Sequence, residues 1–139
     1  MSAKFGLEIL TPGKKVLEDT VSEVILPAWD GERGVLPDHE NFIGKLGTGP
    51  LKLVRDGNDY WYVISGGIYE VREGSVSVLA EHVEEASSID HALALSKEEE
   101  LKDLIPKTNL NSSEGAQLLL ELEKAKARLD VHTRTKAVH

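Results

Sequence analysis

Apolar and polar residues alternate through most of the first 80 residues of the chain. Phe5, Leu7 and Ile9 are apolar at every second position, which is the period of a strand with one buried face. The run from Tyr60 to Ile64 carries the strongest strand signal. Many short strands of this kind predict an antiparallel sandwich or barrel. The predicted strands cover residues 4–11, 16–17, 21–29, 35–36, 42–43, 51–54, 60–64, 68–71 and 76–80.

Two turn signals lie between these strands. Asp56-Gly57-Asn58 predicts a hairpin turn, because Gly and Asn tolerate positive φ. The pair Gly66-Gly67 lets the backbone bend between two strand segments. Such a pair also occurs in phosphate-binding loops, but no helix follows at once and the flanking pattern stays strand-like. We therefore interpret it as a bend.

The last third of the chain is helical in pattern. Ser87 is followed three residues later by Asp90, which approximates a capping box. This predicts a helix over about residues 88–104, which Pro106 ends. Lys97 interrupts the apolar positions of that helix, so its buried face is irregular. Those positions are Ile89, Leu93, Leu101 and Leu104.

A second helix-start signal is Asn111 with Glu114 three residues on. Two amphipathic helices joined by a polar link form a helical hairpin, and such helices depend on tertiary packing. Because this hairpin has few large apolar residues, we expect a weakly docked, mobile appendage. The predicted domains are a sandwich, residues 1–86, and a hairpin, residues 87–139. The second helix carries one continuous apolar stripe, formed by Leu118, Leu122, Ala125 and Leu129.

Composition narrows the classes of function. The formal net charge of −8 argues against nucleic-acid binding, which rests on a positive surface. The absence of cysteine excludes disulfides and thiolate metal sites. No apolar run approaches the length of a transmembrane helix, and no signal peptide is visible. We expect a protein inside the cell or organelle that reaches a membrane only through partners, without direct insertion.

Charge is unevenly distributed along the helical part. Residues 81–103 hold eight acidic residues against two lysines, whereas residues 124–139 are basic. This suggests two contact surfaces; the alternative is two solvated helix faces that neutralise each other. We expect the acidic first helix to neutralise the basic end, because the sandwich offers no equivalent acidic density. The basic residues are Lys124, Lys126, Arg128, Arg134 and Lys136.

Candidate catalytic groups do not form a constellation. The histidines have no metal-ligand spacing, and Ser65 lacks the Gly-x-Ser-x-Gly frame of a nucleophile elbow. Asp30 and Glu32 form a carboxylate pair on a turn, where such pairs are usually solvated. His39 is either a general base or, more commonly for such a position, a surface contact. We predict no catalytic residue and no metal site. The histidines are His39, His82, His91, His132 and His139.

The segment 31–42 predicts a partner-binding loop. Its glycines accept backbone angles that other residues avoid, and Pro37 marks a strand edge or a bend. A short edge strand should therefore lead into a loop that presents Asp38, His39 and Glu40. Loops on a rigid scaffold are common sites of partner binding.

Two motifs in this region carry a family resemblance. Asp-Gly-Glu-Arg-Gly-Val-Leu-Pro-Asp-His at residues 30–39, with Ile-Ser-Gly-Gly-Ile-Tyr-Glu-Val at residues 64–71, resembles the epsilon subunit of the rotary ATP synthase. The family usually reads Gly-Glu-x-Gly-(Val/Ile)-x-Pro-Gly-His and later Ser-Gly-Gly-x-x-Glu-Val. The resemblance covers about residues 5–85 and continues more loosely beyond. The chain departs from it at Asp38, where glycine is usual, and at Asn41, where proline is usual.

The resemblance implies a β-sandwich followed by a two-helix hairpin, in a non-catalytic central-stalk subunit of the bacterial or plastid kind. The sandwich of this family binds the gamma subunit and rests on the membrane c-ring. Glu32 and His39 match residues in the region that meets the c-ring loops, and Asp38 lies beside them. The implied location is the cytoplasmic face of the inner (plasma) membrane, or the stromal face of a plastid thylakoid membrane.

The resemblance also implies a role for the hairpin. In the family it folds against the sandwich, or extends along gamma into the alpha/beta catalytic head and inhibits ATP hydrolysis. The inhibitory contacts would fall on the basic residues of the second helix and tail. Some bacterial members bind ATP in the compact form, through a motif resembling (Ile/Leu)-Asp-x-x-Arg-Ala. Here Leu93 replaces its arginine, so we expect weak ATP binding or none. The candidate ATP-site residues are Glu84, Asp90, Lys124 and Arg128.

Three functions of different classes follow from these patterns. The first is a rotor subunit that couples gamma to the c-ring, with no cofactor of its own. The second is a stand-alone nucleotide-sensing or adaptor module on the same scaffold. The third, a small hydrolase, is the least supported because no catalytic constellation is present.

Overall fold

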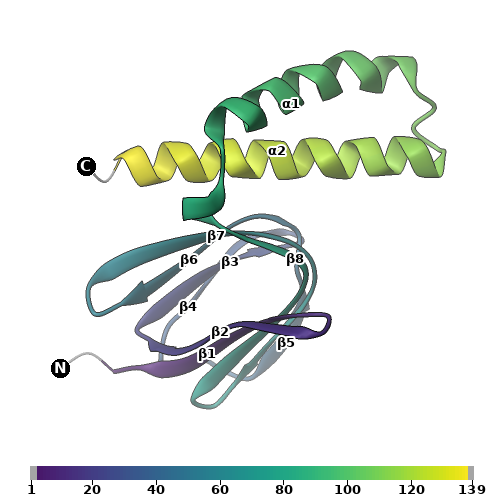
Figure 1. The fold of residues 1–139 in the computed structure, drawn as a ribbon. Coiled ribbons are helices and arrows are strands. Elements are labelled where there is room, and N and C mark those ends of the chain that lie inside the picture. Colours follow the sequence, from purple (N-terminus) through teal and green to yellow (C-terminus); the bar gives the residue numbers. More distant parts are fainter. Residues whose placement is uncertain (1–2, 138–139) are drawn as a thin grey trace.

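The computed structural model describes residues 3–137, with side chains as far as residue 135. Eight strands come first and a helical hairpin follows, as the sequence predicts (Figure 1). The strands are β1 (Phe5–Thr11), β2 (Lys14–Val21), β3 (Glu23–Ala28), β4 (Gly31–Val35), β5 (Phe42–Lys45), β6 (Thr48–Arg55), β7 (Asn58–Arg72) and β8 (Ser75–Glu85). The helices are η1 (Ala86–Ser88), α1 (His91–Leu104), η2 (Ile105–Lys107) and α2 (Ser113–Ala137).

The strands form a β-sandwich whose hydrogen-bonded order is β2-β1-β8-β7-β6-β3-β4, with β5 paired to β7. Neighbouring strands are antiparallel, except that β1 and β8 are parallel. The sequence predicts antiparallel pairing throughout. Parallel pairing arises here because strands distant in sequence meet, and local hydrophobic alternation carries no information on strand direction.

The long strand β7 links the two layers of the sandwich. Its first half pairs with β6 and its second half with β5, and the change occurs at Gly66-Gly67. Both glycines have positive φ, 71° and 106°, so the predicted bend is confirmed. A Cβ at Gly67 would lie 2.0 Å from the carbonyl oxygen of Leu79, so only glycine fits.

The core of the sandwich follows the alternation seen in the sequence. Phe5, Leu7 and Ile9 are buried, and the intervening residues of β1 are only half-buried. The β6–β7 turn is a two-residue loop in which Asp56 and Gly57 have positive φ. Asn58 instead pairs with Arg55 as the first residue of β7. The turn is as predicted, but Asp56 adopts the positive φ expected of Asn58.

The helix starts lie one to three residues from the predicted positions, whereas α1 ends at Leu104 as predicted. Helix α1 begins at His91, and the carboxylate of Asp90 caps it by accepting from the Leu93 amide at 3.1 Å. The predicted capping Ser87 lies in η1 instead. At the start of α2 the hydroxyl of Ser112 accepts from the Gly115 amide at 3.0 Å, so Ser112 takes the capping role predicted for Asn111.

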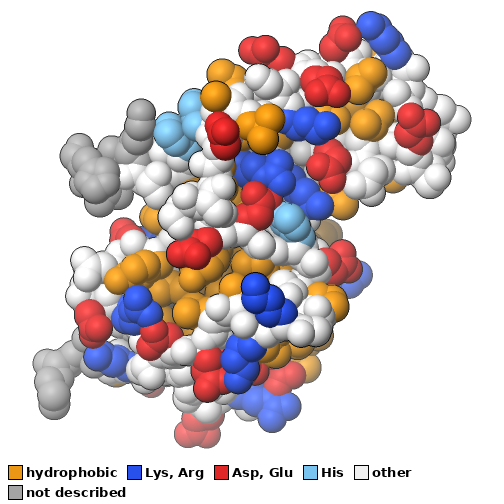
Figure 2. All heavy atoms as spheres, viewed as in Figure 1, with side chains coloured by type: hydrophobic (Ala, Val, Ile, Leu, Met, Phe, Trp, Pro, Cys, Tyr) orange, Lys and Arg blue, Asp and Glu red, His pale blue; other side chains and the backbone are white. Residues whose placement is uncertain are grey.

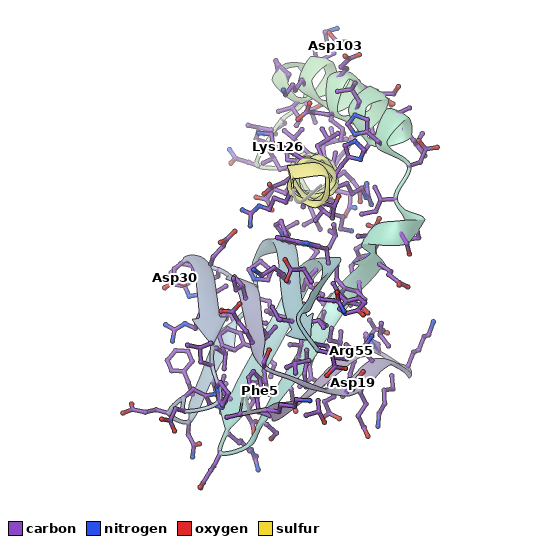
Figure 3. The ribbon with its side chains drawn as sticks, turned by 90° about the vertical axis from the view of Figure 1, so that its left-hand side faces the viewer. Phe5, Asp19, Asp30, Arg55, Asp103 and Lys126 are labelled. Carbon is purple, nitrogen blue, oxygen red and sulfur yellow. The ribbon has the colours of Figure 1, made fainter. Side chains whose placement is uncertain are left out.

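Helix α2 lies between α1 and the sandwich (Figures 1 and 3). The buried residues of α1 are Ala94 and Leu101, whereas Leu93 is 67% exposed. The predicted apolar face of α1 was therefore wrong at Leu93, since the helix turns a small residue toward α2. Within residues 3–137 no helix is long and apolar enough to cross a membrane.

Candidate functional site: the joint between hairpin and sandwich

A small apolar contact joins α2 to the outer face of the sheet. Val63 of β7 points away from the main sandwich core and is fully buried against Ala127 and Val131 of α2. Trp61 and Ile89 pack around this cluster. Ala127 and Val131 are four residues apart and form a second apolar stripe that the sequence analysis overlooked.

An ion pair ties α2 to the end of β8. The Arg128 guanidinium donates from Nε to both carboxylate oxygens of Glu84, at 2.9 and 3.0 Å, and from Nη2 at 2.7 Å. The His82 ring contacts the same carboxylate. Burial raises the pKa of Glu84, but hydrogen bonds from Arg128 and His82 outweigh it and leave the pKa below its ordinary value. Glu84 is therefore held as a carboxylate in the docked hairpin.

A second ion pair ties α2 to β4. Arg134 donates from Nη2 to Glu32 at 2.6 Å and from Nε to Asp130 at 3.0 Å. Its guanidinium carbon lies 5.6 Å from the centre of the Trp61 ring. The hydrogen bond to Glu32 is the main reason that the pKa of Arg134 is raised.

The rings of His91 and His132 also stack at 3.8 Å, which links the start of α1 to the end of α2.

These pairs correct the expected distribution of charge. Acidic residues opposite the basic end of α2 come from the sandwich, namely Glu84 on β8 and Glu32 on β4, and not from α1. The carboxylates that the structure pairs within α1 instead meet its own lysines or those of η2. Figure 2 shows basic and acidic side chains meeting at the neck between hairpin and sandwich. Sequence position did not predict this, because Glu32 and Arg134 are 102 residues apart in the chain.

A cavity lies where β8 leads into α1, and it contains three of the four predicted ATP-site residues. Its volume is about 460 Å³. Glu84, Asp90 and Arg128 line it, together with the exposed Leu93. Lys124 is not among the lining residues; it pairs with Glu121 of its own helix at 3.6 Å. The remaining lining residues are Ser88, Ile89, Ala94 and Lys97.

The cations that line this cavity differ in their availability. Arg128 donates three hydrogen bonds to Glu84, so it is not free to bind a phosphate. Lys97, which the sequence analysis treated as an interruption, is the other cation of the cavity. The site therefore holds two carboxylates, one engaged guanidinium and one amine.

The predicted partner-binding residues do not gather at one point. Figure 3 places Asp30 at the end of the sandwich nearest α2, and Glu32 lies two residues further along on β4. His39 lies away from the hairpin, with its ring edge-on to Phe5 at 5.4 Å between centroids. The His39 ring nitrogens face the carbonyl oxygens of Leu36 and, at 2.9 Å, Arg72. His39 thus holds its loop in place, and Asp38 beside it is exposed.

The remaining basic residues of α2 have different surroundings. Lys126 is exposed and lines a groove of about 400 Å³ between α2 and the sandwich. Trp29, which is exposed, and the buried Gly49 line the opposite wall. The side chain of Lys136 lies outside the described side chains. Of the predicted inhibitory contacts, Arg128 and Arg134 are thus bound to the sandwich, and Lys126 borders an open groove.

Known proteins resemble this chain in sequence and fold. The family model of the ATP synthase Delta/Epsilon chain β-sandwich domain matches residues 4–86. The ATP synthase epsilon chain of Syntrophobacter fumaroxidans is 37% identical over 135 residues, which cover 97% of this chain and all of the relative. The chain belongs to the ATP synthase epsilon chain family.

Solved structures extend the likeness to the hairpin. A chain in the Euglena gracilis mitochondrial ATP synthase OSCP/F1/c-ring assembly has a TM-score of 0.80 at 24% identity, covering 100% of this chain and 84% of that one. A chain in the Tetrahymena thermophila mitochondrial central stalk/c-ring structure has a TM-score of 0.61 at 13% identity, covering 96% and 97%. The family confirms the predicted class, a non-catalytic epsilon subunit of the central stalk.

Proposed function

We propose that this epsilon chain couples the gamma subunit to the membrane c-ring and restrains ATP hydrolysis through a hairpin that detaches from the sandwich. The observation that carries the proposal is the small size of the joint. One buried apolar cluster and two ion pairs hold α2 to the sandwich, and an open groove flanks them. Such a joint is compatible with release, because each ion pair can be exchanged for another charge partner.

The partner surface that we propose runs along β4 and into the following loop. Strand β4 ends the hydrogen-bonded order of strands, and residues 31–34 are exposed. Glu32 and Asp38 offer carboxylates to the c-ring loops or gamma. His39 sets the conformation of the loop that follows β4, through its contacts with backbone carbonyl oxygens. The extended hairpin would present Lys124, Lys126, Arg128, Arg134 and Lys136 to the alpha/beta catalytic head.

We propose a peripheral location that depends on these partners. It is the cytoplasmic face of the inner (plasma) membrane in a bacterium, or the stromal face of the thylakoid membrane in a plastid. The subunit needs no cofactor for coupling. ATP binding at the cavity between β8 and α1 is weak or absent, because Leu93 supplies no charge and Arg128 is engaged.

Coupling is tested with charge-neutralising variants of the assembled complex. Glu32→Gln with Asp38→Asn should weaken the coupling of ATP hydrolysis to proton pumping, and Glu18→Gln serves as a matched control. Glu18 is also an exposed carboxylate, but it pairs with Lys15 within β2. Normal coupling in the double variant would overturn the proposed surface. His39→Ala is unsuitable here because it would also remove the hydrogen bonds that order the loop.

The adaptor alternative makes a different prediction about partners. A stand-alone nucleotide-sensing or adaptor module would not co-purify with a tagged gamma subunit of the same organism. Stoichiometric recovery with gamma would support the rotor function. Recovery of the chain without gamma, at concentrations where the sandwich is folded, would favour the alternative.

A further inference from the structure

One carboxylate serves two functions in this fold. Glu32 belongs to the partner surface proposed above, yet its Oε1 atom accepts a hydrogen bond from Nη2 of Arg134 at 2.6 Å. We propose that Glu32 is shared between α2 and the c-ring, so that a lysine or arginine of the ring that pairs with Glu32 displaces Arg134 and loosens the hairpin. This inference rests on the proposed function, because it requires Glu32 to face the ring.

The geometry around Arg134 means that a change of partner at Glu32 has a small cost in free energy. When Glu32 is taken by another cation, Arg134 retains the carboxylate of Asp130 at 3.0 Å and the face of Trp61. No buried charge is left without a partner, since the side chains of Arg134 and Glu32 are 38% and 47% exposed. Exposed pairs of this kind shift an equilibrium by at most about fivefold. The Glu32–Arg134 contact therefore makes docking of α2 respond to whether the ring is bound at Glu32, but it does not by itself hold the hairpin in place.

The position of Arg134 explains why its loss would be felt by the hairpin. Arg134 lies three residues beyond Val131, which is the last buried apolar residue among the described side chains of α2. The groove beside Trp29, Lys126 and Asp130 leaves one flank of α2 without packing. Loss of the Glu32 contact should first free the C-terminal turns of α2, while Arg128 still holds the helix at Glu84.

Thermodynamic linkage makes the coupling reciprocal. If binding of the ring weakens docking of α2 by some factor, docking of α2 weakens binding of the ring by the same factor. A docked hairpin would thus loosen the grip of the sandwich on the ring at Glu32. A subunit seated on the ring would in turn have a hairpin closer to release.

The contribution of the Glu32–Arg134 ion pair to docking of α2 is tested first in the isolated full-length chain. Hydrogen–deuterium exchange of α2 amides should rise about two- to fivefold in Glu32→Gln and in Arg134→Gln. The charge-reversed pair Glu32→Arg with Arg134→Glu should lower exchange relative to Glu32→Arg alone, although Arg134→Glu also places a carboxylate beside Asp130. Glu18→Gln and Lys102→Gln are matched controls, because their ion pairs lie within β2 and within α1. Unchanged exchange in both single variants would show that the Glu32–Arg134 ion pair does not hold α2, and would overturn the inference.

The coupling is tested by adding the ring. In the unmodified subunit, exchange at the C-terminal turns of α2 should be higher in the assembly with gamma and c-ring than with gamma alone. In Arg134→Gln exchange should already be high, and the ring should add nothing. If the ring protects amides 31–39 but leaves α2 exchange unchanged, the inference is overturned and the proposed function stands. If the ring leaves amides 31–39 unprotected, the proposed surface is wrong and the inference falls with it.

Discussion

Arg128 and Glu84 join the second helix to the last sandwich strand through a fork in which two guanidinium nitrogens contact both carboxylate oxygens. Both side chains are about four-fifths buried, with 21% and 20% of their surfaces exposed. A pair with this geometry is more than a surface ion pair, because its charges are shielded from solvent and fixed in direction. The docked state of the hairpin depends on it.

Removal of one partner should loosen the hairpin without unfolding the sandwich. Arg128→Ala takes away three donor contacts and should reduce the free energy of docking by about 1–3 kcal/mol. Amide exchange in α1 and α2 should rise, while β1 and β7 keep their protection. Lys102→Gln, which breaks an exposed pair within α1, should leave docking unchanged. Equal exchange in the two variants would show that Arg128 does not hold the hairpin.

Acid should release the hairpin through the same carboxylate. The folded-state pKa of Glu84 lies below its ordinary value of 4.5, so its contribution is complete above that value and is lost as pH falls through the lower, folded-state pKa. The contribution of the Glu84 pair to docking should therefore be constant from neutral pH to about 5 and weaken only at more acidic pH. Docking of the hairpin can be followed by amide exchange of α2 or by the fluorescence of Trp61. Glu84→Gln should remove the acid-dependent step. A loss of docking that begins well above pH 5 would require another group.

Nucleotide binding should respond to a single substitution in the cavity. Leu93→Arg restores the missing cation beside Asp90, and a charged hydrogen bond is worth about 1.5–3 kcal/mol. ATP affinity measured by calorimetry should rise by about tenfold or more. Leu95→Arg is the matched control, since Leu95 is also an exposed residue of α1 but does not line the cavity. Tight ATP binding by the unmodified chain would contradict this prediction.

The bend in β7 should be intolerant of a side chain. Gly67→Ala combines a φ of 106° with a Cβ that would meet the Leu79 carbonyl, and it should lower the free energy of unfolding by about 3 kcal/mol or more. Gly13→Ala provides the comparison, because Gly13 also has positive φ but faces open space. Its cost should be about 1 kcal/mol. Similar thermal shifts in the two variants would mean that the close approach to Leu79 is unimportant.

Truncation tests the division of the chain into two parts. Deletion of residues 88–139 should leave a folded sandwich that still binds gamma, because the main core is built from strands alone. The truncated complex should hydrolyse ATP at least as fast as the intact one. A sandwich that unfolds or loses gamma would contradict the two-part architecture. Unchanged hydrolysis at low salt would remove the inhibitory role and leave coupling intact.

Local patterns predicted most of the fold. Alternation located the strands, glycines located the bend and the turn, and the polar link located the helical hairpin. Each of these depends on a few neighbouring residues. The parallel pairing of β1 with β8 was not predicted, because it depends on which distant strands meet. The buried face of α1 was predicted only in part: Leu101 is buried as expected, but Leu93 and Leu104 are exposed and the small buried Ala94 was overlooked.

The candidate site was predicted only in part. Glu84, Asp90 and Arg128, which the family resemblance grouped as ATP-site candidates, line one cavity, because the resemblance joins segments that sequence spacing cannot. The pairing of Glu32 with Arg134 was not foreseen. Charge segregation along the chain suggested that the two helices neutralise each other, but proximity in sequence does not decide which charges meet in space.

The position of β8 within the sheet has a mechanical consequence. This strand leads directly into the hairpin; it pairs with β7 along its whole length and with β1 over residues 75–79. A pull on a released hairpin would enter the sandwich at Glu85, the last residue of β8. Directed along the strand axis, it would load the β7 ladder in shear over the whole strand and the β1 ladder over residues 75–79, rather than peel an edge strand one bond at a time. The helices can be pulled without dismantling the domain that anchors them.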